Sequence, residues 1–316
     1  MLLKNFFKLV EIKTKLASLI PFFLGSVYAI YRYKSFDLKN FIIMFISLLA
    51  FDMATTTINN YVDHKKSNKN QISNIVNDSL IAKYGVNEIA VLSIIFTLLS
   101  IAIIFGIMLT LNTNIVVLFL GVISFVAGIL YTFGPIPISR MPLGELFSGF
   151  FMGFIIIFLS IYIHIYDTNI ISFTYQNNIL SLSINLLEIL SIFLFSIPAI
   201  VGIANIMLAN NICDVEEDIL NKRFTLPYYI GKPMALGLFR LLYYIGYVDI
   251  VVLVVLKIIP LASLLTLLTF TIVNKNINLF NNKPIKSENF VLSVKNFVLM
   301  NSTQIIIIGI ICTIYN

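Results

Sequence analysis

The chain has 316 residues, of which 59% are hydrophobic and 11% are charged, and its mean hydropathy is +0.96. Soluble domains carry roughly 45–50% apolar and about 25% charged residues, so this composition excludes a water-soluble globular fold. It also excludes intrinsic disorder, which requires low hydrophobicity and high charge. Two cysteines are too few for a disulfide framework or a cysteine-based metal site.

Apolar runs long enough to cross a bilayer recur along the chain. They lack the two-residue alternation of barrel strands, and in lipid only helices or closed barrels satisfy their backbone groups. We therefore predict an all-α, polytopic membrane bundle of about nine transmembrane helices, built as a single domain over residues 1–316. We read the N-terminal run as a retained first span and not as a signal peptide. In chain order the expected spans are Leu16–Tyr31, Phe41–Asn59, Ile89–Leu111, Ile115–Phe133, Leu146–Tyr166, Leu186–Ala209, Ala235–Leu256, Ile258–Val273 and Val294–Ile314.

The distribution of lysine and arginine predicts the orientation of these spans. With the N-terminus in the cytoplasm, 17 of the 21 basic residues fall in cytoplasmic segments, and only Arg32, Lys34, Lys39 and Lys257 fall on the opposite side. Cytoplasmic loops of membrane proteins carry an excess of Lys and Arg. The net charge of +6 therefore reflects basic residues that set the orientation of the protein in the cell membrane. We expect no nucleic-acid partner.

The second expected span ends in a polar stripe. Asp52, Thr56, Asn59 and Asp63 are spaced by three or four residues, so they share one face of a helix. Polar groups in lipid are costly and usually face a bundle interior or a wet cavity. This stripe indicates a hydrophilic pocket that opens to the cytoplasm.

The sixth expected span ends in the same way. Asn210, Asp214 and Asp218 are spaced by four residues. Oxygen ligands on two helices suit Mg²⁺, which binds a few carboxylates together with waters and substrate phosphates. Basic residues follow each cluster, at Lys65 and Lys66 and at Lys222 and Arg223. Carboxylates for Mg²⁺ with cations beside them are what a diphosphate leaving group requires.

Two segments resemble the aspartate-rich motifs of the UbiA-type intramembrane prenyltransferases: residues 59–63 (NNYVD) and 211–218 (NICDVEED). Further segments are similar to the branch of that family that prenylates 1,4-dihydroxy-2-naphthoate in menaquinone biosynthesis. They are residues 13–21 (KTKLASLIP), 131–137 (YTFGPIP), 143–149 (LGELFSG) and 221–227 (NKRFTLP). The first motif departs from the family pattern, because Asn60 and Ser67 or Lys69 stand where aspartates are usual. Asp63 is the only carboxylate left in that cluster.

The resemblance implies a UbiA-type architecture and a mechanism. Asn59, Asp63, Asp214 and Asp218 would hold Mg²⁺ against the diphosphate of a polyprenyl donor, and Asp63, Asp214 and Asp218 would be the catalytic carboxylates. Cations would stabilise the departing charge. In the branch that this chain resembles most, the acceptor is 1,4-dihydroxy-2-naphthoate, which would lose its carboxylate on alkylation to give demethylmenaquinone. The expected substrate-binding residues are Asn60, Lys66, Tyr131, Arg140, Asn210, Asn211, Lys222 and Arg223.

Several alternatives stay open. Tyr131 is either a cation-stabilising ring or an interfacial anchor, and the loop from Gly134 to Arg140 either shapes the acceptor site or simply breaks a helix. The acceptor is the naphthoate, 4-hydroxybenzoate, another quinone precursor or a porphyrin. The thin first motif also allows an inactive homologue. From another class, a cation-coupled transporter would place its acidic residues near the bilayer midplane, whereas these lie at span ends.

Overall fold

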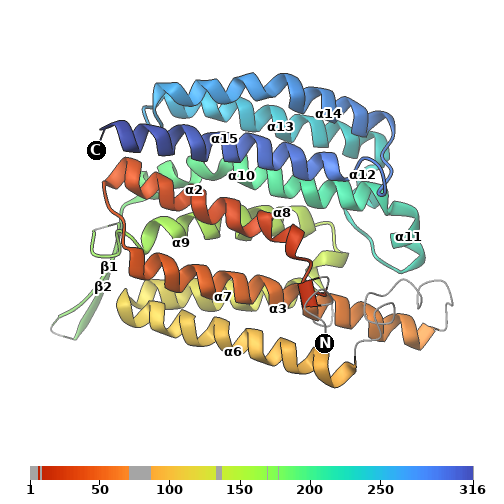
Figure 1. Cartoon of the computed structure of the whole chain (residues 1–316), viewed down its shortest axis with the longest axis horizontal. Helices are drawn as coiled ribbons and strands as arrows, with labels where there is room; N and C mark the ends of the chain where they lie inside the picture. Colours follow the sequence, from red (N-terminus) through yellow and green to blue (C-terminus); the bar gives the residue numbers. More distant parts are fainter. Residues whose placement is uncertain are drawn as a thin grey trace. The chain divides into compact units, whose positions relative to one another are not determined.

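The computed structural model describes residues 6–7, 9–70, 87–132, 137–168, 170–176 and 178–315, and most of these residues are helical (Figure 1). By its internal contacts the chain divides into two compact units. Unit 1 comprises Met1–Leu19 and Ile42–Pro137, and unit 2 comprises Ile20–Phe41 and Ile138–Asn316. The two segments with polar clusters therefore belong to different units.

Seven helices of the described part are long and apolar enough to cross a membrane. Each overlaps one of the expected spans, which confirms the all-α membrane fold. They are α2 (Leu16–Tyr33), α3 (Leu38–Asn70), α6 (Glu88–Asn112), the helical segment Gly144–Tyr162, α10 (Leu186–Cys213), α13 (Lys232–Val255) and α15 (Val291–Tyr315).

Two further expected spans are helical but do not meet the same criterion, so a count of nine stays a prediction. Helix α7 (Ile115–Thr132) is apolar over a shorter stretch. The expected span Ile258–Val273 begins after a turn at Lys257, whose φ is 58°, and continues as a 3₁₀ helix, η4 (Leu261–Thr269). The chain then enters α14 (Phe270–Asn282), which is rich in asparagine and ends nine residues beyond the expected boundary.

Unit 1 packs α3 against α6 and α7. The ring of Phe51 stacks on Phe125 with centroids 4.0 Å apart, and a Cβ on Gly128 would lie 2.8 Å from the Phe51 ring. Ser47 donates a hydrogen bond of 2.8 Å to the carbonyl of Ala102 on α6. Small residues thus let these helices approach closely, as is common where lipid tails are as apolar as the helix surface.

Unit 2 is built around α10, which contacts α13, α15 and the segment from Gly144 to Tyr162. That segment consists of α8 (Gly144–Ser148), a π-helical stretch, η3 (Gly149–Ile155), and α9 (Ile156–Tyr162). The close approach of η3 to α10 requires glycine, because a Cβ at Gly149 or Gly153 would lie 2.9 Å or 2.6 Å from backbone atoms of Ile200. The π-helix was not predicted from the sequence.

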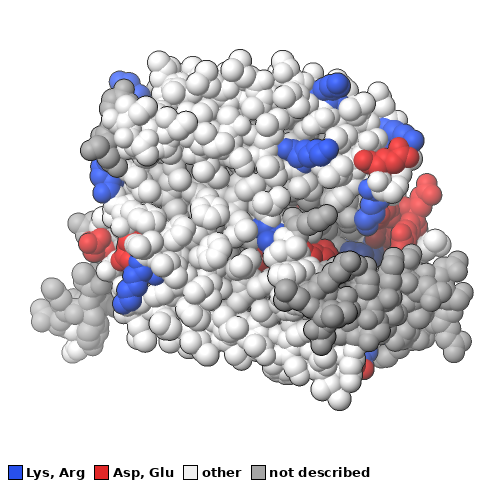
Figure 2. Space-filling view, in the orientation of Figure 1, with Lys and Arg blue, Asp and Glu red and all other residues white. Residues whose placement is uncertain are grey.

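An antiparallel hairpin precedes α10, where the sequence analysis predicted no regular structure. Strands β1 (Ile171–Gln176) and β2 (Ile179–Ile184) pair in the register Ser172 to Ser183. Apolar or aromatic residues alternate with hydroxyl residues over 171–175 and 180–184, which is the pattern of a strand with two different faces. On the face shown in Figure 2, charged side chains are sparse over α13, α14 and α15, and acidic ones gather beside α11 (Val215–Leu220).

Candidate active site

The second aspartate-rich motif lies at a break between two helices of unit 2. Asp214 ends α10 and begins α11, with φ −102° and ψ 6°. Its N–H donates to the carbonyl of Asn210 over 3.1 Å, and its carbonyl accepts from the N–H of Asp218 over 2.7 Å. The helical hydrogen bonding thus continues through the joint, which keeps the two carboxylates one turn apart, as their spacing predicted.

The carboxylate of Asp214 forms an ion pair with Lys286, which comes from the linker between α14 and α15. The side chain of Asp214 is 15% exposed and that of Lys286 is largely exposed. The sequence analysis counted Lys286 only as a topology residue, since 72 positions separate it from its partner. A mostly exposed ammonium group on a mostly buried carboxylate is a counterion that a ligand can displace.

Asp218 is more deeply buried, with a side chain that is 6% exposed. The guanidinium Nε of Arg223 lies 3.4 Å from Oδ1, and the hydroxyl of Thr225 donates to Oδ2 over 3.5 Å. Burial raises the pKa of the Asp218 carboxyl, and Arg223 opposes this effect while the charge of Asp214 adds to it. Each carboxylate has one basic partner in this arrangement, and both keep oxygen atoms that suit a divalent cation.

The predicted basic residues Arg140, Lys222 and Arg223 meet at this end of unit 2. Arg140 ends the short 3₁₀ helix η2 (Ile138–Arg140), and its carbonyl accepts a hydrogen bond of 3.1 Å from the N–H of Phe224. Lys222 is exposed and takes a left-handed φ of 53°. The N–H of Arg223 donates to the carbonyl of Asp218 over 2.8 Å. These bonds hold the two basic segments beside the buried carboxylate.

The predicted residue Asn211 has a partner that the sequence analysis did not assign. Its Nδ2 donates to Oε1 of Glu145 over 2.8 Å, and both side chains are buried. Oε2 of Glu145 and Oδ1 of Asn211 have no hydrogen-bond partner within the described residues. The sequence did contain one sign of this pair: Glu145 is the single acid in the apolar segment 143–149. Asn210, half-buried, is joined to this site through its backbone bond to Asp214.

The first motif lies on α3 in unit 1. Asn59 is exposed, and the Nδ2 of Asn60 donates to the carbonyl of Leu9 over 3.0 Å and to Glu11 over 3.2 Å. The predicted residues Asp63 and Lys66 are on this helix, but their side chains lie outside the described part. Tyr131 is half-buried at the end of α7, and the loop 133–136 is likewise outside the described residues.

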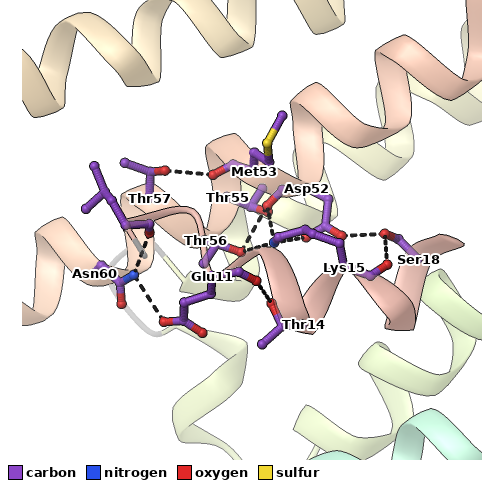
Figure 3. A network of polar contacts seen from close by, with 11 residues as sticks. Glu11, Thr14, Lys15, Ser18, Asp52, Met53, Thr55, Thr56, Thr57 and Asn60 are labelled. Carbon is purple, nitrogen blue, oxygen red and sulfur yellow. Dashed lines mark hydrogen bonds and ion pairs between the residues drawn. The ribbon is translucent and has the colours of Figure 1, made fainter. Parts of the chain in front are cut away.

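Asp52 and Thr56 of the polar stripe in the second span contact a buried lysine (Figure 3). Nζ of Lys15 lies 2.6 Å from Oδ1 of Asp52 and 2.6 Å from the hydroxyl of Thr56, and Ser18 donates to the other oxygen of Asp52. Lys15 is 1% exposed and Asp52 is 14% exposed. The shared face of Asp52 and Thr56 is confirmed. Lys15 was expected as a cytoplasmic residue within the similar segment 13–21, and no partner was predicted for it.

Hard oxygen donors suited to Mg²⁺ are present in unit 2, as the carboxylates of Asp214 and Asp218. Within the described residues no group of three or more His, Cys, Asp or Glu side chains converges on one point. A cation here would therefore need further oxygens from waters or from a phosphate ligand, which is how Mg²⁺ is usually held.

Comparison with known proteins gives a family match and a curated relative. The model of the "UbiA prenyltransferase family" matches residues 18–293. A curated protein of Bacillus subtilis (strain 168), 1,4-dihydroxy-2-naphthoate octaprenyltransferase, is 31% identical over 234 residues, which cover 74% of this chain and 68% of the relative.

Solved structures share the fold at low identity. A UbiA homolog from Aeropyrum pernix K1 superposes with a TM-score of 0.68 at 16% identity, covering 93% of this chain and 97% of that chain. A UbiA homolog from Archaeoglobus fulgidus, solved bound to GPP and Mg²⁺, has a TM-score of 0.63 at 10% identity, covering 98% and 99%. The same homolog bound to DMAPP and Mg²⁺ gives 0.61 at 11%, covering 96% and 99%.

Proposed function

This chain belongs to the UbiA prenyltransferase family and is an integral membrane prenyltransferase, and we propose that it transfers a polyprenyl group from polyprenyl diphosphate to 1,4-dihydroxy-2-naphthoate. The observation that carries the proposal is the 31% identity to the Bacillus subtilis naphthoate enzyme over most of both chains. Because the family model spans residues of both units, we further infer that residues 1–316 act as one domain.

The proposed reaction balances without a further reactant. The C–O bond between the prenyl group and its diphosphate breaks, and the allylic carbon forms a bond to the ring carbon that carries the carboxylate. The carboxylate leaves as carbon dioxide and its electron pair restores the aromatic ring. The products are diphosphate, carbon dioxide and the quinol form of demethylmenaquinone.

We propose that Asp214 and Asp218 hold Mg²⁺, and that Asn59 and Asp63 contribute ligands on the strength of the motif resemblance. The homolog from Archaeoglobus fulgidus was solved with Mg²⁺ and prenyl diphosphates, which supports a divalent metal in this family. When bound, the metal neutralises charge on the diphosphate as it leaves. The fit rests on the donor set of this chain, in which the carboxylates of Asp214 and Asp218 pair with Lys286 and Arg223 among the described residues.

Basic side chains of this chain also stabilise the negative charge of the departing diphosphate. Arg223 and Lys222 adjoin Asp218, and the backbone of Arg140 is bonded to the same segment. Guanidinium groups match phosphate oxygens through paired N–H donors. We propose that these residues, with Lys66 and the amides of Asn60, Asn210 and Asn211, bind the substrates, and that Tyr131 faces the allylic cation.

We propose that the protein lies in the plasma membrane. Its N-terminus and its aspartate-rich segments face the cytoplasm, as the distribution of basic residues predicts. A different acceptor within the same family, 4-hydroxybenzoate or a porphyrin, is the second candidate. Family membership favours the enzyme over a cation-coupled transporter.

The test uses membranes that contain the protein, Mg²⁺, radiolabelled prenyl diphosphates and a panel of aromatic acids. We expect a Mg²⁺-dependent, lipid-soluble product with dihydroxynaphthoate. Asp214→Asn and Asp218→Asn each should lower the rate by about 100-fold or more, because charge stabilisation of the leaving group is lost. Glu216→Gln, an exposed neighbour on the same helix, is the matched control and should retain the rate.

Three results would contradict parts of this assignment. Product with 4-hydroxybenzoate alone would remove the naphthoate as acceptor. Full activity in Asp214→Asn or Asp218→Asn would remove the metal ligands. No product with any acceptor would show that the first motif, with its single carboxylate, no longer supports catalysis.

A further inference from the structure

The linker between α14 and α15, residues 283–290, carries a lysine that reaches the second aspartate-rich motif. The ammonium group of Lys286 pairs with Oδ2 of Asp214. The side chain of Lys286 is 55% exposed, whereas that of Asp214 is 15% exposed. Because a lysine side chain is long and flexible, this ammonium group can leave the carboxylate without any movement of the helices.

Contacts within the linker hold its backbone in place. Pro284 comes soon after the end of α14, and proline cannot continue a helix. The N–H of Asn289 donates to the carbonyl of Ile285 over 2.9 Å, and its Nδ2 donates to the carbonyl of Lys283 over 2.7 Å. Lys286 lies inside the turn that these bonds close, so its backbone is fixed while its side chain stays exposed.

The two lysines of the linker have different partners. Nζ of Lys283 lies 2.8 Å from Oε2 of Glu288, which belongs to the same linker. Lys286 pairs instead with a carboxylate at the joint of α10 and α11. Of the two lysines, only Lys286 therefore brings positive charge to the motif, and Lys283 offers a matched control.

The charge of Lys286 also reaches the second carboxylate of the motif. Burial raises the pKa of the Asp218 carboxyl, whereas the charges of Arg223 and Lys286 act against that rise. Lys286 therefore lies close enough to both aspartates to influence what binds between them and the solvent.

We propose that Lys286 pairs with Asp214 only in the ligand-free enzyme, and that it moves to the diphosphate of the donor when metal and substrate bind. This inference rests on the proposed metal site at Asp214 and Asp218. Without substrate, binding of Mg²⁺ is weakened because the ion pair of Lys286 with Asp214 is lost. With a prenyl diphosphate, whose negative charge exceeds what one Mg²⁺ neutralises, the released ammonium group gains a phosphate partner. Lys286 thus makes the binding of metal and the binding of diphosphate depend on each other.

The test measures each ligand by itself, with the full chain purified in detergent. Mn²⁺, which binds to the same hard oxygen ligands, is titrated without diphosphate and followed by electron paramagnetic resonance. Lys286→Gln should bind Mn²⁺ about fivefold more tightly than the wild type, because no ion pair is lost. Radiolabelled inorganic diphosphate is then titrated at saturating Mg²⁺, and the same variant should bind it about tenfold more weakly, because one charged partner is missing.

Two variants serve as controls for charge and for position. Lys286→Arg keeps the positive charge, and both affinities should stay within about twofold of the wild type. Lys283→Gln removes the other lysine of the linker, which pairs with Glu288, and it should bind both probes as the wild type does. The inference is overturned if Lys286→Gln binds either probe with the affinity of the wild type.

Failure of the inference and failure of the metal site give different results. If Asp214→Asn abolishes Mn²⁺ binding while Lys286→Gln leaves it unchanged, the metal site stands and the role of Lys286 is wrong. If neither the wild type nor Lys286→Gln binds Mn²⁺, or if Asp214→Asn binds it as the wild type does, the proposed metal site is wrong and this inference falls with it.

Discussion

At the scale of single residues, the environment decides the role of a charge. Lys15 looks like one more basic residue before the first span, yet the structure buries it between Asp52 and Thr56. Lys286 looks like a loop residue and forms the ion pair with Asp214. Local sequence predicts where charge lies along the chain, but a partner 37 or 72 residues away is set by packing alone.

The ion pair of Lys15 with Asp52 gives a prediction for stability. In Lys15→Met the carboxylate keeps its burial and loses its counterion, so the free energy of unfolding should fall by about 3 kcal/mol. The double variant Lys15→Met/Asp52→Leu removes both charges and should recover most of that loss. Equilibrium unfolding in mixed micelles measures both. A double variant as unstable as the single one would show that the pair is not the cause.

At the level of helices and strands, the length of an apolar run predicts a membrane helix but does not predict a hairpin or a π-helix. The apolar runs locate the spans, but the hairpin of β1 and β2 is shorter than a span and lies between two of them, so it was missed. Its alternation of apolar and hydroxyl residues covers only five residues in each strand. No amino-acid pattern distinguishes the π-helix η3 from an ordinary apolar helix. It goes with the close approach of Gly149 and Gly153 to α10, which only the packing shows.

That close approach predicts the effect of one methyl group. In Gly153→Ala the new Cβ would lie 2.6 Å from Cα of Ile200, so the helices must separate. We expect a loss of about 2 kcal/mol of stability, as in overpacked cores. Gly309→Ala on α15 is the matched control, since nothing lies within 4 Å of its Cβ, and it should be neutral or slightly stabilising. Thermal melts of equal Tm for the two variants would contradict the tight contact.

At the scale of the whole molecule, the basic residues predict how the chain crosses the membrane. In a variant with Cys213 and Cys312 changed to serine, a single cysteine is placed at Glu216 or at Asp167, both of which are exposed. A membrane-impermeant maleimide should label Asp167→Cys in intact cells, and Glu216→Cys only after permeabilisation. The reverse pattern would invert the topology, and with it the cytoplasmic location proposed for the diphosphate site.

The amino-acid pattern alone was enough to predict the membrane class, most of the helices and the positions of the second motif. These depend on local properties: the length of apolar runs, and the four-residue spacing of Asp214 and Asp218. The fold was needed to find Lys286 as the counterion of Asp214 and the buried pair of Glu145 with Asn211. These two pairs join residues 72 and 66 positions apart, and their register follows from side-chain packing between helices, which no local pattern specifies.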